Sequence, residues 1–221
     1  MTLVKTEIVG FAEYHKIDTL FERDKSTFVV DPNMIKSPVL ATISEWDVTE
    51  KIDGTNVRVM LSQEGDVSFG GRSNNAMLPA DFIQRLIQLF PSSRMKNLWI
   101  DGNSSQFVLY GEGYGAGIQK GGAYRAEKDF ILFDVLVDDK WWLERDAIND
   151  VASRMGIDVV PYLGRMTLSQ IVEFVRVPFY SKIGSAVGEG IVARPIETLF
   201  DRRGERVIIK LKTKDFSPGK R

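Results

Sequence analysis

The sequence lacks cysteine entirely and has a single histidine, His15, among its 221 residues. The absence of cysteine excludes disulfides, thiolate metal sites and a cysteine nucleophile. One histidine cannot form a histidine metal cluster. No apolar run approaches the roughly 20 residues of a membrane span, and the N-terminus lacks the pattern of a secretory signal. We therefore expect no membrane association and a cytoplasmic location, in the host cytoplasm if the protein is viral.

The chain also lacks a marked excess of either charge. Lys and Arg total 29 and Asp and Glu total 30, so the net charge is −1. This balance says little about partners, because nucleic-acid binding depends on where the positive charges lie. No repeat, low-complexity segment or Pro/Gly/Ser-rich linker divides the chain, so residues 1–221 are predicted to form one domain.

Hydrophobic periodicity and capping signals predict a mixed secondary structure. We expect helices over residues 80–90, 144–155 and 167–177. We expect strands over residues 56–61, 107–110, 130–137, 190–194 and 206–211. The strands outnumber the helices and the order is mixed, which predicts an α+β fold with largely antiparallel sheets.

Short charged and glycine-containing motifs recur along the chain. A lysine that attacks the α-phosphate of a nucleotide needs an acid to hold it, cations to neutralise phosphates, and acids for ribose and metal. The chain supplies these groups in order. The motifs are Lys51-Ile52-Asp53-Gly54, Gly71-Arg72-Ser73, Tyr110-Gly111-Glu112-Gly113, Glu189-Gly190-Ile191-Val192 and Lys210-Leu211-Lys212.

The first motif contains the candidate nucleophile, Lys51. In an extended chain Asp53 shares its face and could orient the lysine or a metal. Gly54 permits a tight turn or close approach of a ligand. Asn56 could contact the nucleotide. Chance matches to this tetrapeptide are common, so it carries weight only together with the other motifs.

The other cations have both a functional and an ordinary interpretation. Arg72 can grip a phosphate with two parallel donors, or it can be an exposed arginine in a hairpin turn. Lys210 and Lys212 alternate on a predicted strand and therefore point to one side of the sheet. They are phosphate ligands if that side faces Lys51, and a solvated strand edge otherwise.

The acids and one aromatic complete the set. Glu112 is expected just past a strand, in a mobile glycine-rich loop, where its carboxylate could accept from a ribose hydroxyl or hold a metal-bound water. Glu189 could bind Mg²⁺ through water, or be a surface glutamate. Phe133 could stack on a purine, or be a core phenylalanine.

In this order, the motifs resemble those of the covalent nucleotidyltransferase superfamily, which comprises ATP-dependent DNA ligases, RNA ligases and mRNA capping enzymes. The chain most resembles the RNA ligase 2 family, from about Glu45 to Lys214. The resemblance implies an ATP-grasp-like nucleotidyltransferase domain in which largely antiparallel sheets flank a nucleotide cleft. It also implies that Lys51 forms a lysyl–AMP intermediate.

The resemblance implies the nucleotide-binding residues as well. Glu112 would hold the ribose, Phe133 would stack on adenine, and Mg²⁺ or Mn²⁺ would be served by Glu112 and Glu189. The full expected set for ATP is Glu50, Lys51, Ile52, Asp53, Gly54, Asn56, Arg72, Glu112, Phe133, Glu189, Lys210 and Lys212.

The implied substrate is RNA, as a nicked duplex or as single-stranded ends, with DNA-containing strands as a further option. Family members commonly carry a C-terminal domain, but only residues 213–221 follow Lys212. We therefore expect no C-terminal OB-fold or helical domain, and a helper protein could replace it. The alternatives are a DNA ligase, an mRNA-capping guanylyltransferase, and a non-catalytic nucleotide- or RNA-binding module.

Overall fold

The structure is a computed structural model that describes residues 11–27, 29–100 and 103–216. The chain divides into two compact units, each built from two stretches of sequence. Unit 1 comprises Met1–Tyr14 and Asp53–Val160, and unit 2 comprises His15–Ile52 and Pro161–Arg221. Each unit has its own sheet and its own hydrophobic core. The motif at residues 51–54 therefore crosses from unit 2 into unit 1.

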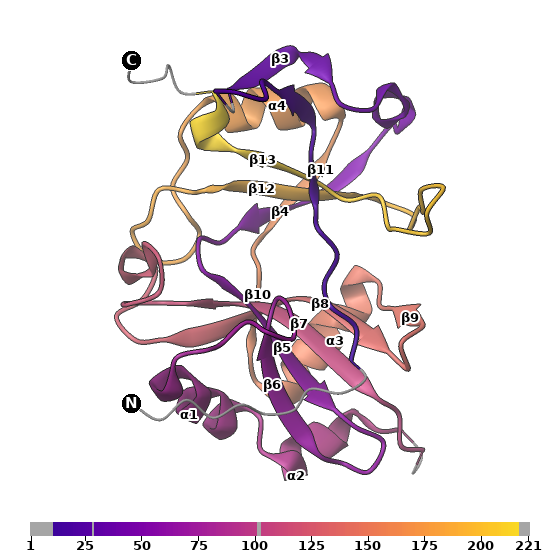
Figure 1. Ribbon diagram of the computed structural model, residues 1–221, viewed down its shortest axis with the longest axis vertical. Helices are drawn as coiled ribbons and strands as arrows, with labels where there is room; N and C mark the ends of the chain where they lie inside the picture. The colour runs from indigo at the N-terminus through magenta and orange to yellow at the C-terminus, as the bar shows by residue number, and fades with distance from the viewer. Residues whose placement is uncertain (1–10, 28, 101–102, 217–221) are drawn as a thin grey trace. The chain divides into compact units, whose positions relative to one another are not determined.

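The sheet of unit 1 has the strand order β10-β8-β7-β5-β6, with β9 also paired to β8 (Figure 1). All of its pairings are antiparallel except that of β10 with β8. The strands are β5 (Thr55–Leu61), β6 (Val67–Gly71), β7 (Phe107–Tyr114), β8 (Asp129–Val137), β9 (Trp141–Trp142) and β10 (Asp158–Val159).

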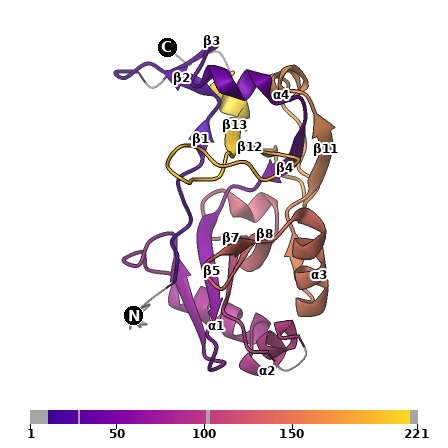
Figure 2. The same ribbon diagram turned by 90° about the vertical axis from the view of Figure 1, so that its right-hand side faces the viewer.

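Helices cover one face of this sheet (Figure 2). Phe82 and Leu86 of one helix and Ile148 of another pack into a core with the strand residues Val57 and Leu109. Because side chains alternate along a strand, this core takes every second residue of β5 and β7. The helices are α1 (Ala80–Leu89), α2 (Ser92–Met95) and α3 (Arg145–Met155), and the 3₁₀ turns are η2 (Lys96–Leu98) and η3 (Gly121–Ala123).

The other face of the unit 1 sheet carries its polar side chains. Asn56 lies opposite Glu112, and Arg58 lies opposite Tyr110, which in turn lies opposite Asp134. Directly opposed residues point to the same face. These five side chains therefore share the face that α1, α2 and α3 leave uncovered.

The sheet of unit 2 has the strand order β1-β13-β12-β4-β11, and a separate hairpin pairs β2 with β3. Figure 1 shows β4, β12 and β13 side by side at its centre. The strands are β1 (Asp18–Thr19), β2 (Phe21–Arg23), β3 (Val30–Ile35), β4 (Trp46–Lys51), β11 (Tyr162–Met166), β12 (Gly190–Pro195) and β13 (Ile209–Lys212). The helical elements are α4 (Leu168–Arg176) and the 3₁₀ turns η1 (Pro38–Thr42) and η4 (Thr213–Asp215).

Helix α4 packs on one face of this sheet. Its Ile171 and Val175 share a core with Val48, Ile191 and Leu211 of the three central strands. Strand alternation then places Lys51, Lys210 and Lys212 on the opposite face. The burial along β4 and β13 follows this alternation, with the lysines half-buried between buried neighbours.

The predicted α+β fold with largely antiparallel sheets is confirmed. The three predicted helices are present within a residue or two of their expected ends. Thr167 caps α4 through a reciprocal capping box with Gln170, and Gly156 ends α3 in the left-handed conformation with φ 62°. Among the described residues, no helix combines the length and apolar character needed to cross a bilayer.

Two local expectations were wrong. Glu112 does not follow a strand in a mobile loop, because β7 continues through it to Tyr114. The ladders with β5 and β8 hold this stretch on both sides, and that pairing overrides the low strand propensity of glycine. The last strand begins at Ile209, three residues later than predicted, because Arg206 instead pairs with Phe200 in an isolated bridge.

The core of unit 1 yields a stability prediction. Replacing Phe82, which is fully buried, by alanine should lower the free energy of unfolding by about 3–5 kcal/mol, because it leaves a cavity between α1 and the sheet. The matched control is Ile87→Ala on the same helix, where the side chain is 55% exposed and the cost should stay within about 0.5 kcal/mol. Urea denaturation followed by circular dichroism measures both. Equal losses for the two variants would contradict this packing.

Candidate functional site

Three strand ends meet on the open face of the unit 2 sheet. Gly190, the first residue of β12, lies directly opposite Lys51 of β4 on one side and Lys212 of β13 on the other. Opposed residues on neighbouring strands point to the same face. The two lysines therefore rise on either side of a residue that has no side chain.

The backbone explains why glycine occupies this position. An added Cβ at Gly190 would lie 2.0 Å from the carbonyl oxygen of Leu211 and 2.7 Å from Cα of Lys212. Both neighbours are backbone atoms and cannot move aside without breaking the ladder. Any larger residue would push β12 away from β13, and with it the lysine pair. The glycine in this motif is therefore required by the packing of strands that bear the lysines.

Glu189 joins the two lysines. Its Oε2 accepts from Nζ of Lys51 at 2.6 Å, and its Oε1 accepts from Nζ of Lys212 at 2.5 Å. The three side chains are between 14% and 25% exposed, so the pairs are partly shielded from water and still accessible. One carboxylate thus contacts two ammonium groups at the ends of the three central strands.

The environment of Glu189 shifts its acidity. Burial acts to raise the pKa of its carboxyl group, but the charges and hydrogen bonds of Lys51 and Lys212 outweigh burial and hold the pKa below its usual value. The carboxyl is therefore ionised at neutral pH. The adjacent backbone is also held, because Thr213 donates its N–H to the Glu189 carbonyl and its hydroxyl to the Gly188 carbonyl.

Lys210 lies two ladder positions further from the strand ends. It is opposite Val192 of β12, on the same face as Lys51 and Lys212. The predicted alternation of Lys210 and Lys212 is thus present in β13. Lys51, Glu189 and Lys212 are in direct contact, and Lys210 stands beside them on the same open face.

Two residues around the first motif are buried, Ile52 within it and Glu50 just before it. Glu50 is 1% exposed, and its Oε2 accepts from the backbone N–H of Lys182 at 3.0 Å. Its Oε1 is buried with no hydrogen-bond partner among the described residues. Ile52 is 3% exposed. Because Glu50 precedes Lys51 on β4, its side chain points to the α4 side of the sheet, and a role for it in ATP binding stays a prediction.

In unit 1 the motif continues through a bend into β5. The N–H of Asp53 donates to the hydroxyl of Tyr124 at 3.4 Å. A Cβ at Gly54 would lie 2.2 Å from the carbonyl oxygen of Gly113 and 2.8 Å from Cγ of Glu112. Gly54 is therefore required for the close approach of this bend to β7. The same approach brings the bend against Glu112.

Asn56 and Glu112 lie next to each other on the open face of the unit 1 sheet. The Oδ1 atom of Asn56 is buried and has no hydrogen-bond partner within the described part of the chain. A buried acceptor without a donor costs free energy, so a ligand that donates to it would be favoured. Glu112 beside it is half-buried.

Phe133 is presented by a β-bulge. The register passes from Asp134 opposite Tyr110 to Leu132 opposite Gly111, so Phe133 has no partner on β7. A bulge bends the strand and redirects the extra side chain. Its ring is half-buried and meets the ring of Tyr14 edge to face, with centroids 5.1 Å apart. Phe133 is thus outside the main core cluster, contrary to its ordinary interpretation as a core residue.

Arg72 is the first residue after β6 and is exposed. It stands at the start of the loop that leads to α1. Its position at the end of a strand matches the expectation of a loop arginine. The predicted site residues are divided between the two units. Unit 2 contains Glu50, Lys51, Ile52, Glu189, Lys210 and Lys212, and unit 1 contains Asp53, Gly54, Asn56, Arg72, Glu112 and Phe133.

The acidic residues do not form a protein-only metal cage. Among the described residues, no group of three or more His, Asp and Glu side chains could hold a metal ion. Both Glu189 oxygens accept from lysine ammonium groups. Mg²⁺ keeps several waters and often binds one or two carboxylates together with substrate phosphates. The side chains present therefore fit a cation that arrives with a nucleotide, held by a single carboxylate.

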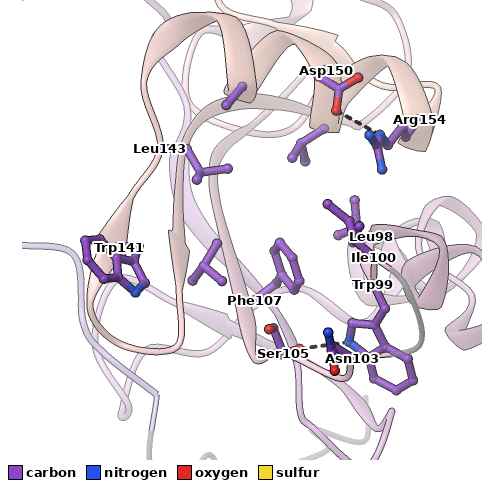
Figure 3. A pocket seen from close by; sticks show the side chains of 13 residues that line it. Leu98, Trp99, Ile100, Asn103, Ser105, Phe107, Trp141, Leu143, Asp150 and Arg154 are labelled. Atoms are coloured by element: carbon purple, nitrogen blue, oxygen red, sulfur yellow. Dashed lines mark hydrogen bonds and ion pairs between the residues drawn. The ribbon is translucent and has the colours of Figure 1, made fainter.

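A separate cavity of unit 1, about 440 Å³ in volume, contains none of these residues. Figure 3 shows Phe107, Leu98 and Leu143 around it, with the ion pair of Asp150 and Arg154 at one side. Its lining is mainly apolar and comes from α3, η2 and the ends of β7 and β8. Nothing in its chemistry matches a phosphate or ribose.

The segment before β1 contributes residues that sequence reasoning missed. Tyr14 is buried, and its hydroxyl donates to Oδ2 of Asp134 at 2.7 Å. Arg58 is fully buried beneath the same segment. No local pattern indicated either contact, because both join segments far apart in the chain. The aromatic character of Tyr14 was the only available signal.

Comparison with known proteins agrees with this geometry. The family model described as RNA ligase matches residues 44–212. A Naegleria gruberi RNA ligase mutant solved with ATP and Mn matches with a TM-score of 0.64 and 18% identity, over 93% of this chain and 62% of that one. Another mutant of that ligase, with AMP and Mn, matches with a TM-score of 0.63 and 18% identity, over 91% of this chain and 60% of that one.

A third Naegleria gruberi mutant structure, without ligand, gives a TM-score of 0.63 at 19% identity, over 90% of this chain and 60% of that one. The chain thus spans about three fifths of the length of these ligases. At this identity the structures establish the shared fold, and the family model covers every motif from Lys51 to Lys212. The chain belongs to the RNA ligase family.

Proposed function

We propose that this protein is an ATP-dependent RNA ligase that works through a covalent lysyl–AMP intermediate on Lys51. The observation that carries the proposal is the contact of Lys51 and Lys212 with one carboxylate at three adjacent strand ends. One lysine would be enough to neutralise the Glu189 carboxylate, so the second lysine is not needed for the ion pair itself. Two ammonium groups on an accessible face suit a ligand with several negative charges.

In the first step, Nζ of Lys51 attacks the α-phosphorus of ATP. A nitrogen–phosphorus bond forms, the bond to the bridging oxygen breaks, and pyrophosphate leaves with its electron pair. The amine must lose a proton to attack. In this structure Nζ of Lys51 donates to Glu189, so this contact has to break before the amine attacks.

The remaining cations and acids bind and orient the nucleotide. Lys212 and Lys210 neutralise the α-phosphate, and Arg72 contacts a phosphate or the nucleotide. Glu112 accepts from a ribose hydroxyl, and Phe133 stacks on adenine. The Oδ1 atom of Asn56, which has no partner among the residues the structure describes, accepts from a donor of the ligand. A bound Mg²⁺ or Mn²⁺, held by Glu189 or Glu112, would neutralise developing phosphate charge.

Two further transfers complete the reaction. A 5′-phosphate oxygen of RNA attacks the phosphorus of lysyl–AMP, which frees Lys51 and leaves AMP on the RNA end. A 3′-hydroxyl then attacks that 5′-phosphate, loses its proton and expels AMP, so that a phosphodiester bond forms. Each step is a phosphoryl transfer and depends on positioning and charge neutralisation.

The partners and location are part of the same proposal. RNA is the substrate, as a nicked duplex or single-stranded ends, with DNA-containing strands as a second option to be tested. A helper protein that binds RNA is a further partner in this proposal. The whole chain acts as one catalytic domain in a cytoplasm.

The nucleophile is tested by labelling. Wild-type protein incubated with α-labelled ATP and Mg²⁺ should retain label after denaturation at neutral pH, and intact-mass spectrometry should find an AMP-sized increment on Lys51. Lys51→Ala should abolish both signals. Lys212→Ala should slow labelling by about 10²–10³-fold, because one cation that stabilises the transition state is lost. The control is Lys214→Ala, at an exposed lysine two residues away, which should label like wild type.

Three outcomes would overturn this assignment. Undiminished label in Lys51→Ala would mean that another residue is modified. Label from GTP and not from ATP would favour a capping guanylyltransferase. ATP binding without release of pyrophosphate would favour the non-catalytic module. Sealing of nicked duplexes with RNA or DNA on the 3′-hydroxyl side separates an RNA ligase from a DNA ligase.

The acidity of Glu189 gives a prediction that does not depend on catalysis. Its pKa is lower in the folded protein than in the unfolded chain, so its ion pairs stabilise the fold fully above about pH 4.3 and are lost as the pH falls through the lowered pKa. Glu189→Gln should therefore lower the free energy of unfolding by about 1–3 kcal/mol at pH 7.

The difference between wild type and Glu189→Gln should shrink as the pH is lowered from 5 toward 3. Urea denaturation at several pH values measures it. The control is Glu205→Gln, at an exposed glutamate of the same unit, which should show a much smaller difference at pH 7. A Glu189→Gln deficit that is constant with pH would contradict the role of ionisation.

A further inference from the structure

Arg58 is a fully buried arginine on β5. It lies on the face of the unit 1 sheet that α1, α2 and α3 do not cover. Burial lowers the pKa of Arg58 below its usual value, against the opposing effects of Glu13 and Tyr110. A guanidinium out of water is costly unless its donors are satisfied by well-placed acceptors. The acceptors that these donors reach therefore indicate which parts of the protein the buried guanidinium holds together.

The donors of Arg58 join two separate segments. Nε donates to the carbonyl of Gly71 at 2.8 Å, and Nη2 donates to Oδ1 of Asn74 at 2.8 Å. Nη1 donates to the carbonyls of Phe11 and Ala12 at 3.2 and 3.4 Å. One planar side chain thus holds the loop after β6 and the segment before β1.

Further bonds close this arrangement. The N–H of Asn74 donates to Oε1 of Glu13 at 2.9 Å, and the hydroxyl of Tyr110 donates to the Ala12 carbonyl at 2.8 Å. Tyr14, at the end of the segment, contacts the ring of Phe133. We call the set of Arg58, Asn74, Glu13 and the carbonyls of Phe11, Ala12 and Gly71 the Arg58 clamp. The clamp therefore contacts the loop that contains Arg72 and the segment that ends at Tyr14, whose ring packs against Phe133.

Arg72 lies between the two loop positions that the clamp holds. Gly71 immediately precedes it, and Asn74 follows two residues later. The Arg72 side chain itself is exposed, so the position of its backbone sets where it can reach. An exposed arginine on a free loop loses much conformational entropy when it grips a phosphate, and a fixed backbone reduces that cost.

We propose that Arg58 is a positioning residue of the ligase, which fixes the backbone of Arg72 so that its guanidinium is ready for the nucleotide or phosphate. The inference rests on the proposed function, in which Arg72 contacts that ligand. Arg58 acts through Arg72 and does not touch the substrate. Its fork of donors is needed, because a lysine keeps the charge and cannot bond Gly71 and Asn74 together.

The test uses Asn74→Ala, which removes one bond of the clamp and leaves the buried guanidinium in place. The rate of lysyl–AMP formation is measured against ATP concentration for wild type, Asn74→Ala, Arg72→Ala and the double variant. Asn74→Ala should lower kcat/KM by about fivefold to tenfold. In the Arg72→Ala background, Asn74→Ala should have no further effect on kcat/KM, because Asn74 acts through Arg72.

The matched control is Asn75→Ala, at the neighbouring exposed asparagine, which should match wild type in rate and in unfolding midpoint. A rate of Asn74→Ala equal to that of Asn75→Ala would overturn the proposal. So would an undiminished effect of Asn74→Ala in the Arg72→Ala background, since Arg58 would then act by another route.

A second measurement separates this inference from the proposed function. Hydrogen exchange of Arg58→Lys should become faster for residues 72–76 and 12–14, with the central amides of β5 and β7 unchanged. This readout needs no ATP. Wild type that fails to label contradicts the proposed activity alone, whereas unchanged exchange in Arg58→Lys contradicts the clamp even in an active enzyme.

Discussion

The contact of one carboxylate with two lysines is the constraint on which the open face of unit 2 depends. Glu189 can reach both ammonium groups only because Lys51 and Lys212 lie in register across a glycine. The register is set in turn by the opposite face, where Val48, Ile191 and Leu211 pack under α4. A shift of one residue in either ladder would turn the lysines into that core. The apolar packing of one face therefore determines the chemistry of the other.

The same separation of faces organises unit 1. Helices cover the side that carries Val57 and Leu109, and the polar groups Asn56, Glu112 and Arg58 occupy the other side. Two of these groups serve different ends. Within the described part of the chain, the Oδ1 atom of Asn56 has no hydrogen-bond partner, whereas Arg58 donates to backbone carbonyls and to one asparagine. An acceptor left open on a rigid strand is suited to a ligand, and a side chain bonded to several segments is suited to holding them together.

Much of this architecture could be predicted from the sequence, for physical reasons that differ between elements. The helices carried local signals, such as the Thr167 capping box and the left-handed Gly156. The motifs were recognised together, because their joint order along the chain is specific and no single motif is. Glu112 was misplaced, because glycines beside it have low strand propensity and only the neighbouring strands hold them extended.

The contacts that could not be predicted join distant segments. A charged residue is rarely fully buried, so nothing local marked Arg58 as an interior group. The bulge at Phe133 depends on a register shift between two strands, which no single strand encodes. The resemblance assigned Glu189 to the metal and did not indicate its contacts with the two lysines. The sharing of its two oxygens between Lys51 and Lys212 follows only from the ladders of three strands.

Unit 2 is built from two stretches of sequence that are far apart in the chain, and this affects the order in which its strands can pair during synthesis. Lys51 and Glu189 are 138 positions apart in the chain, and the whole of the unit 1 sheet is encoded between them. During synthesis β4 leaves the ribosome long before β12, its partner on that side, and before β13, which pairs with β12. Such high contact order slows assembly and exposes an unpaired apolar strand meanwhile. The contacts of Glu189 with Lys51 and Lys212 can therefore form only after the last strands of unit 2 have been made.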